Sequence, residues 1–228
     1  MKILDKGFIE VVDKLGSDLT VVNAAKVSFG EEKKIFDEKD FKLVKYLAKN
    51  KHFSPFRHIM IQFHIKAPEF VMRQLYKHVV GIETTSSYPT KDHAWNELSL
   101  RYKTIHEYYT PEKWRKQSKD NKQASDGNLP DDKQVALGEM FRHGMNYIFD
   151  LYYKLIDWGV AREQARMVLP LSLYTEVYWT ASFQAIANFI ELRDKPESQY
   201  EIMLYAKAID KIASELFPNI HTAWFDKK

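Results

Sequence analysis

The sequence predicts an α+β fold, in which a mixed β-sheet core is flanked by helices and followed by a mostly helical C-terminal half. Two segments carry this prediction. Side chains in residues 59–65 alternate with the period of two that is typical of a strand, and residues 135–158 repeat apolar side chains at helical spacing. The 228 residues contain no internal repeat. We therefore expect a single domain over 1–228.

The N-terminal half alternates the two kinds of element. A proline before residue 69 suits a helix start, because the first turn has no hydrogen bond for it to lose. Asp18 is a suitable N-terminal cap. The expected elements are a strand within 2–14, helices over 18–28 and 40–50, a turn at 51–57, the strand 59–65 and a helix over 69–78.

The remaining chain contains two polar segments and a series of helices. Residues 82–95 show no periodicity and are expected to form an inserted, exposed loop, whereas 116–134 are expected to form a mobile connection. Gly159 and Pro170 are suitable helix ends. The expected helices are 135–158, 161–169, 182–192 and 197–216.

Composition excludes several classes of chemistry. The chain has no cysteine, which excludes disulfides, thiolate metal sites and cysteine nucleophiles. The 34 Lys and Arg against 31 Asp and Glu leave a net charge of +3, which does not favour a nucleic-acid partner. With no long apolar stretch and no signal peptide, we expect no membrane association and a cytoplasmic location.

The segment Asn96-Glu97-Leu98-Ser99-Leu100-Arg101-Tyr102 has the clearest ligand-binding pattern. If it is extended, Glu97, Ser99 and Arg101 lie on one side, because side chains alternate along a strand. An anion, a hydroxyl and a guanidinium together suit a phosphorylated ligand. The alternative is a surface strand carrying an ordinary ion pair.

Helical spacing groups other polar residues. Gln74, Lys77 and His78 fall on one helical face and suit a phosphate, or else form a solvated face. Glu163 and Arg166 are three apart, as in a surface ion pair. Ser182, Asn188 and Arg193 accompany an apolar helix, where they need partners from a ligand or from the core.

Three histidines recur every six residues, at His52, His58 and His64. This spacing is not helical, and no carboxylate pair accompanies it. We therefore expect no metal site, with His64 as a half-exposed strand residue.

Five segments in order resemble the flavin-dependent thymidylate synthases. The resemblance extends over most of the chain and includes His-Phe-Ser-Pro-Phe-Arg-His at 52–58. The other segments are 63–74, 96–102, 165–180 and 188–193.

The resemblance implies an activity, its cofactors and its assembly. Members bind FAD, reduce it with NADPH and transfer a one-carbon unit from methylenetetrahydrofolate to dUMP, which gives dTMP and tetrahydrofolate. They are homotetramers with active sites shared between subunits. The absence of cysteine agrees, because flavin-independent synthases depend on a cysteine nucleophile.

The same resemblance implies roles for residues of this chain. Arg193 would activate the pyrimidine as a catalytic group, and His52 would lie near the folate and flavin, as would Glu163. The implied dUMP-binding set is Gln74, Lys77, Glu97, Ser99, Leu100, Arg101, Tyr102, Arg166 and Arg193. The implied FAD-binding set is Ser54, Arg57, Lys77, His78, Val79, Glu97, Ser182, Gln184 and Asn188.

The chain departs from the family pattern at one motif. Lys77-His78-Val79 stands where the family has Arg-His-Arg, and the polar insertion follows it. Lysine contacts phosphate as a point charge but without the bidentate fork, and Val79 has no side-chain donor. Ser182 and Gln184 also differ from other members, which implies rebuilt FAD contacts. The alternative function is a nucleotide-binding or regulatory homologue that has lost flavin turnover.

Overall fold

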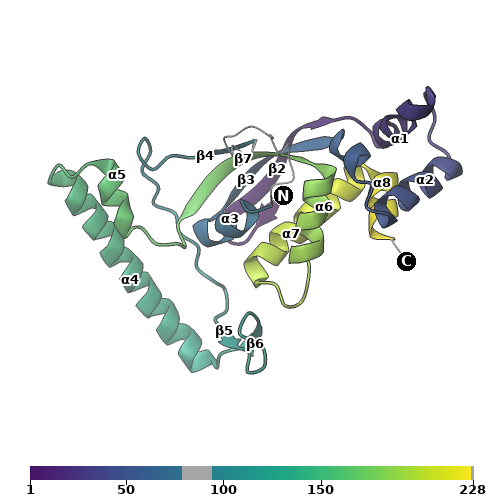
Figure 1. Ribbon diagram of the computed structural model, residues 1–228. Coiled ribbons are helices and arrows are strands. Elements are labelled where there is room, and N and C mark those ends of the chain that lie inside the picture. The colour runs from purple at the N-terminus through teal and green to yellow at the C-terminus, as the bar shows by residue number, and fades with distance from the viewer. Residues whose placement is uncertain (79–93, 227–228) are drawn as a thin grey trace.

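A computed structural model describes residues 1–78 and 94–226 of the chain. Its main sheet has five strands in the order β1-β2-β3-β7-β4, and a separate hairpin joins β5 to β6 (Figure 1). The strands are β1 (Lys2–Ile3), β2 (Gly7–Leu15), β3 (Met60–Pro68), β4 (Trp95–Glu97), β5 (Arg115–Gln117), β6 (Ser125–Asn128) and β7 (Tyr174–Ser182).

The sheet is antiparallel at every pairing of the described strands, so the mixed sheet predicted from sequence is wrong. Strands β1 and β2 follow each other through a short turn, as antiparallel neighbours do. Parallel strands would need long crossover connections. The α+β class itself is confirmed.

Strand β7 was not predicted, although it is a central strand. Val177, Trp179 and Ala181 are buried, while the residues between them are more exposed, which is the alternation of a strand. In the sequence this segment carries part of a family motif, which gives no information on its secondary structure. No turn residue separates it from the following helix, so its end was not visible in the sequence.

Helices cover one face of the sheet and one end of it (Figure 1). Helices α3, α6 and α7 pack against strands, and α1, α2 and α8 pack together. The helices are α1 (Asp18–Lys26), α2 (Glu38–Lys49), α3 (Glu69–Leu75), α4 (Asp131–Asp157), α5 (Arg162–Ala165), α6 (Phe183–Arg193), α7 (Tyr200–Leu216) and α8 (Pro218–Phe225).

The predicted helices all exist, with differences at their ends. The helix expected over 69–78 ends at Leu75, and the one over 161–169 is α5 followed by a 3₁₀ turn, Arg166–Val168. Helix α8 was not predicted. The core between sheet and helices is aromatic: Phe63 stacks on Trp179 with ring centroids 5.7 Å apart.

Helix α4 extends away from the sheet (Figure 1). The predicted helix is confirmed but begins four residues earlier, at Asp131 after Pro130. The polar segment 116–134 contains most of the β5–β6 hairpin and the first turn of α4, which is more regular structure than its composition suggests. Residues 82–93 of the predicted insertion lie outside the described residues. No described helix is long and apolar enough to cross a membrane.

The close packing of β2 against α7 generates a stability prediction. A Cβ at Gly7 would overlap the Tyr205 hydroxyl and lie 2.7 Å from the Ile3 carbonyl oxygen. Gly7→Ala should therefore lower the free energy of unfolding by about 1–3 kcal/mol, measured by denaturant titration. Glu10→Ala, at an exposed position of the same strand, is the control and should change it by less than about 0.5 kcal/mol. Equal stability of the two variants would contradict the close packing of Gly7 against Tyr205 and Ile3.

Candidate functional site

Helix α6 organises the candidate site, because predicted ligand residues lie at both of its ends. It starts directly after β7, where the Ser182 hydroxyl accepts a hydrogen bond from the Ala185 amide at 3.3 Å and caps the helix. It ends at Arg193. Eleven residues at the helical rise separate the two ends by about 15 Å.

The N-terminal end of α6 joins three residues of the predicted FAD set. Arg57 donates from Nε to Gln184 Oε1 at 2.6 Å, although 127 residues separate the two in sequence. Ser182 and Gln184 are each 5% exposed, whereas Arg57 is exposed. The buried amide therefore fixes the Nε of an otherwise exposed arginine.

The C-terminal end of α6 joins Arg193 to His78. Arg193 Nε donates to His78 Nε2 at 3.3 Å, and the His78 ring meets Phe189 edge to face. Burial, followed by the positive charge of Arg193, lowers the pKa of His78 to about 4. The imidazole is therefore neutral near pH 7 and accepts at Nε2, which places its proton on Nδ1. Burial also lowers the pKa of Arg193.

Arg193 and Gln74 line the same cleft, which has a volume of about 470 Å³. Gln74 donates from Nε2 to Gln199 Oε1 at 2.6 Å, so α3 is tied to the segment that follows α6. The other lining residues are Gln123, Leu192, Lys195, Glu197, Ser198 and Gln199. The structure thus brings Gln74 and Arg193, of the predicted dUMP set, to one cleft, and His78, of the predicted FAD set, to Arg193.

Other predicted residues lie apart from this cleft. Strand β4 ends at Glu97, which accepts hydrogen bonds from Thr175 at 3.0 Å and from the Trp95 indole at 3.2 Å. Residues 98–102 leave the sheet and turn, because the Tyr102 amide bonds back to the Ser99 carbonyl at 3.0 Å. The prediction that Glu97, Ser99 and Arg101 share one strand face is therefore wrong. Leu100 lies in the same turn.

Several further residues of the predicted site are exposed and do not line the cleft. Arg166 donates to the backbone carbonyl of Glu163 at 3.4 Å, and no described ion pair joins their side chains. Tyr102 is 80% exposed. His52, Ser54 and Lys77 are exposed, and Asn188 is partly buried on α6. The helical face predicted for Lys77 and His78 is wrong, because α3 ends at Leu75. Val79 lies outside the described residues.

The structure also brings in residues that the sequence did not indicate. Gln199 lies against Gln74, and behind it Glu201 is buried at 3% exposure. The available signal was a charged residue on an otherwise apolar face of the predicted helix 197–216, which marks a side chain in need of a partner.

The described structure gives His64, one of the three histidines that recur every six residues, a role other than metal binding. His64 is half-buried and bonds Glu176 at 3.2 Å, as a strand residue facing its neighbour. Within residues 1–78 and 94–226, no group of three potential ligand side chains is placed to hold a metal ion.

Comparisons with known proteins identify the family. The model of the family described as "Thymidylate synthase complementing protein" (Thy1) matches residues 10–219. A protein named flavin-dependent thymidylate synthase from Thermus thermophilus is 45% identical over 95% of this chain and 74% of its own length. The chain belongs to this family. A flavin-dependent thymidylate synthase from Thermotoga neapolitana is 41% identical over 97% of this chain and 92% of its own length.

Solved structures agree with the family. This flavin-dependent thymidylate synthase family member has a fold similar to that of PolB from Streptomyces cacaoi, a UMP/dUMP methylase, in crystals with 5-Br dUMP. The TM-score is 0.82 and the identity 28%, over 99% of this chain and 97% of PolB. The same methylase bound with 5-Br UMP gives a TM-score of 0.80 at 30% identity, over 99% and 96% of the two chains.

The His78 and Arg193 contact generates a pH prediction. Because the pKa of His78 in the folded protein, about 4, lies below its ordinary 6.5, the unfolded chain binds this proton first. The contribution of His78 to stability should therefore be complete above pH 6.5 and be lost as the pH falls towards 4. Titration of the His78 C2–H resonance by NMR measures the pKa directly.

Removing the positive charge of Arg193 separates the two causes of the lowered His78 pKa, which are burial and that charge. Arg193→Met keeps much of the bulk but loses the charge, so the His78 pKa should rise while staying below 6.5, because burial is the larger cause. The His78→Gln variant assigns the resonance. An ordinary His78 pKa in the unmodified protein would contradict the contact.

Proposed function

We propose that this chain is a flavin-dependent thymidylate synthase, which methylates C5 of dUMP to give dTMP with methylenetetrahydrofolate as the one-carbon donor. Membership of the family and the dUMP-methylase neighbour support this activity. The observation that carries it is the cleft that Arg193 lines together with Gln74, while a neutral His78 accepts a hydrogen bond from the Arg193 guanidinium. Its small-molecule substrates suit a cytoplasmic location, and the family match over 10–219 favours a single domain.

Arg193 has the chemistry to activate the pyrimidine. Its guanidinium stays charged, and partial burial strengthens its attraction for negative charge. A pyrimidine bound in the cleft would gain negative charge at N3 and its neighbouring oxygen, which Arg193 would stabilise. His78 accepts from Nε, so it orients the guanidinium without adding a second charge.

The N-terminal end of α6 fits the flavin cofactor. Arg57 uses Nε to hold Gln184, so its two Nη groups are available to a phosphate. The start of an 11-residue helix also favours an anion. We assign the diphosphate of FAD to this end, with Ser54, Arg57, Ser182 and Gln184 as its proposed contacts. The other proposed FAD contacts are Lys77, His78, Val79, Glu97 and Asn188; His78 lies at the C-terminal end of α6, so this group would contact the rest of the cofactor, with His52 towards the folate. Bound FAD, reduced by NADPH, would supply the hydride for the methyl group.

The dispersed dUMP residues support a site shared between subunits. Glu97, Ser99, Leu100, Arg101, Tyr102 and Arg166 lie outside the cleft that Gln74 and Arg193 line. They would contact the nucleotide from a neighbouring copy of the chain. Lys77, in the exposed turn after α3, would also contact a nucleotide bound by a neighbouring copy. A homotetramer with active sites between subunits is therefore our proposal for the assembly.

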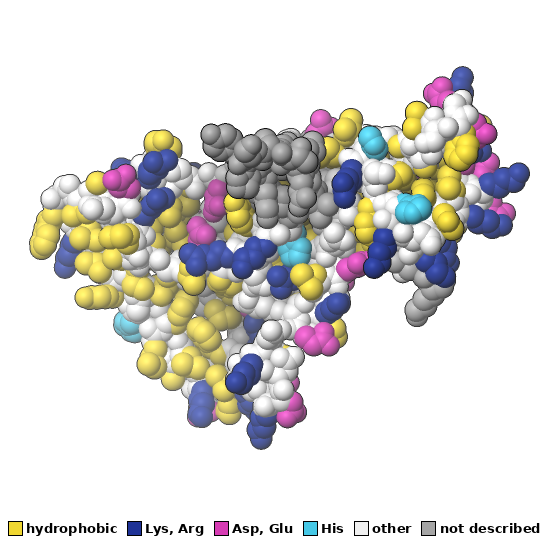
Figure 2. All heavy atoms as spheres, in the orientation of Figure 1, with side chains coloured by type: hydrophobic (Ala, Val, Ile, Leu, Met, Phe, Trp, Pro, Cys, Tyr) yellow, Lys and Arg dark blue, Asp and Glu magenta, His cyan; other side chains and the backbone are white. Residues whose placement is uncertain are grey.

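Helix α4 offers apolar surface for that assembly. Figure 2 shows hydrophobic side chains gathered over the region of α4 and α5. Large apolar side chains there are 65–82% exposed, which is a surface that folded proteins normally cover. They are Val135, Met140, Tyr147 and Trp158.

Substitution of Arg193 tests the activity. Arg193→Ala should lower kcat/KM for dTMP formation by at least about 100-fold, as loss of a charge-stabilising donor does, while the protein still purifies yellow with FAD. Arg193→Lys is the matched control and should keep part of the activity, since it keeps the charge. The measurements are the flavin absorbance, its bleaching by NADPH, and dTMP formation. A colourless protein that binds no added FAD would instead support the nucleotide-binding homologue.

Assembly has its own test. Met140→Asp with Tyr147→Asp should reduce the particle mass below about four times 26.9 kDa in sedimentation, because charge on a buried interface is costly. Lys42→Asp makes a charge change on exposed α2 and should stay tetrameric. An unmodified protein that sediments as a monomer would contradict the proposed shared site.

A further inference from the structure

A buried carboxylate lies behind the cleft. Glu201, in the first turn of α7, is 3% exposed. Its Oε1 accepts from the Tyr109 hydroxyl at 3.1 Å and from Arg115 Nη2 at 2.7 Å. Its Oε2 accepts from Gln199 Nε2 at 3.1 Å. Each oxygen therefore has a different set of donors.

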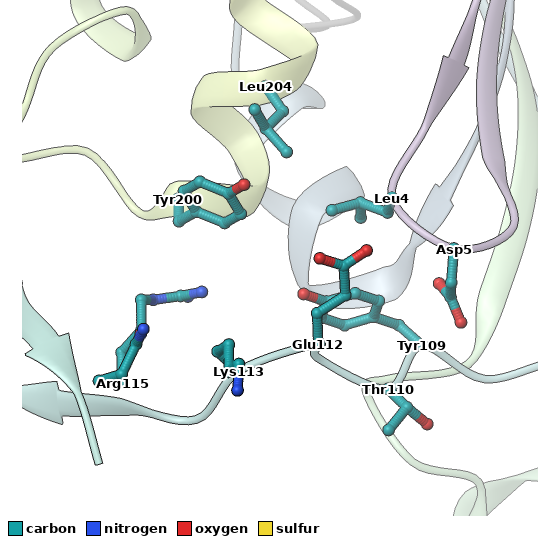
Figure 3. Close-up of a pocket in the computed structure, with 10 residues that line it drawn as sticks. Leu4, Asp5, Tyr109, Thr110, Glu112, Lys113, Arg115, Tyr200 and Leu204 are labelled. Carbon is teal, nitrogen blue, oxygen red and sulfur yellow. The ribbon is translucent and has the colours of Figure 1, made fainter. Parts of the chain in front are cut away.

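The donors on Oε1 are held in place by their own surroundings. The Arg115 guanidinium lies over the Tyr200 ring at 4.8 Å, and both line a cavity of about 380 Å³ with Tyr109 (Figure 3). Burial, and then the negative charge of Glu201, raise the pKa of Tyr109, so its hydroxyl stays protonated and donates. Only Oε2 is left to face Gln199.

A carboxylate accepts hydrogen bonds but does not donate them, so Glu201 sets the direction of the hydrogen bonds from Gln199 and Gln74. Gln199 turns its NH₂ to Glu201 and its Oε1 to Gln74. Gln74 must then donate from Nε2, which also donates to the Phe70 carbonyl oxygen at 3.5 Å, and its own Oε1 is left as an acceptor. Among the described residues, no donor to that oxygen is present.

We propose that Glu201 and Gln199 are positioning residues that fix the amide of Gln74, so that the cleft presents an acceptor oxygen beside the donor Arg193. This inference rests on the proposed function, because it makes Gln74 Oε1 a contact for a hydrogen-bond donor of dUMP. The nucleotide carries such donors at the 3′-hydroxyl and, before negative charge develops at N3, at N3–H.

Removing the charge of Glu201 should reverse the direction of both hydrogen bonds in the series from Glu201 through Gln199 to Gln74. In Glu201→Gln the carbonyl oxygen stays with Arg115 and Tyr109, so the new NH₂ faces Gln199. Gln199 then turns its oxygen inward and its NH₂ to Gln74. Gln74 in turn presents NH₂ to the cleft, opposite a ligand donor.

The test measures dUMP binding by calorimetry in the FAD-loaded protein. Glu201→Gln should raise the Kd for dUMP about tenfold, the effect of one lost hydrogen bond. The double variant Glu201→Gln with Gln199→Glu should restore it, because a carboxylate at 199 accepts from both neighbours and returns Gln74 to its original direction. A purely structural role for Glu201 would give no such rescue.

A control variant and a dUMP analogue show whether the change in Kd is specific and which donor is involved. Gln134→Met removes a glutamine that bonds Trp114 and Leu129 next to the hairpin; it should lower stability without changing the Kd for dUMP. A 2′,3′-dideoxy analogue of dUMP identifies the donor. If Glu201→Gln raises the Kd for the analogue as much as the Kd for dUMP, the donor is N3–H. If Glu201→Gln raises the Kd for dUMP but leaves the Kd for the analogue unchanged, the donor is the 3′-hydroxyl.

The side-chain amide signals of Gln74, assigned by their loss in Gln74→Leu, give a readout that is independent of dUMP. They should shift in Glu201→Gln and return in the double variant. Unchanged signals, or an unchanged Kd for dUMP in Glu201→Gln, would overturn the positioning role. An unmodified protein that binds no dUMP would contradict the proposed function, and the amide signals would still decide whether the chain of hydrogen bonds exists.

Discussion

The antiparallel pairing of β3 with β7 is the interaction on which both ends of the site depend. It runs from Met60 opposite Ser182 to Pro68 opposite Tyr174. At one end the Phe183 amide bonds the Ile59 carbonyl at 3.0 Å, which brings Arg57 to Gln184. At the other end the Glu69 amide bonds the Leu173 carbonyl at 2.9 Å, which starts the helix that carries Gln74. Closing a loop of more than about 100 residues costs conformational entropy, and burial of Phe63 and Trp179 across the pairing offsets it.

Local patterns in the sequence predicted elements well but not their partners. Alternation around Phe63 and helical spacing in α4 are local signals, and both elements exist as predicted. Strand β7 has the same alternation, yet it runs without a turn into α6, so its boundary carries no signal. The antiparallel arrangement depends on which strands meet. That is decided by burial across the whole sheet, which a local pattern does not record.

In the site too, the sequence indicated residues through local motifs but did not indicate their long-range contacts. The motifs indicated Gln74, His78 and Arg193, and the structure places them together. They did not indicate that Glu97 would bond Thr175, or that the chain would turn at Ser99, because these depend on long-range contacts. Glu201 was not recognised because helical periodicity treats a charged residue as exposed. Its burial depends on partners that include Arg115 and Tyr109, which lie 86 and 92 residues away in the sequence.

The two arginines at the ends of α6 differ in electrostatic terms. Arg193 lies at the C-terminal end, where the partial negative charge of the helix favours a cation. Arg57 lies at the N-terminal end, where the partial positive charge disfavours one, and among the described residues it is held there by the amide oxygen of Gln184. An anion bound between Arg57 and the first turn of α6 would remove this conflict. The unfavourable placement of Arg57 therefore supports an anionic group at this end, as the diphosphate of FAD would provide, while Arg193 at the other end requires no such ligand to be stable.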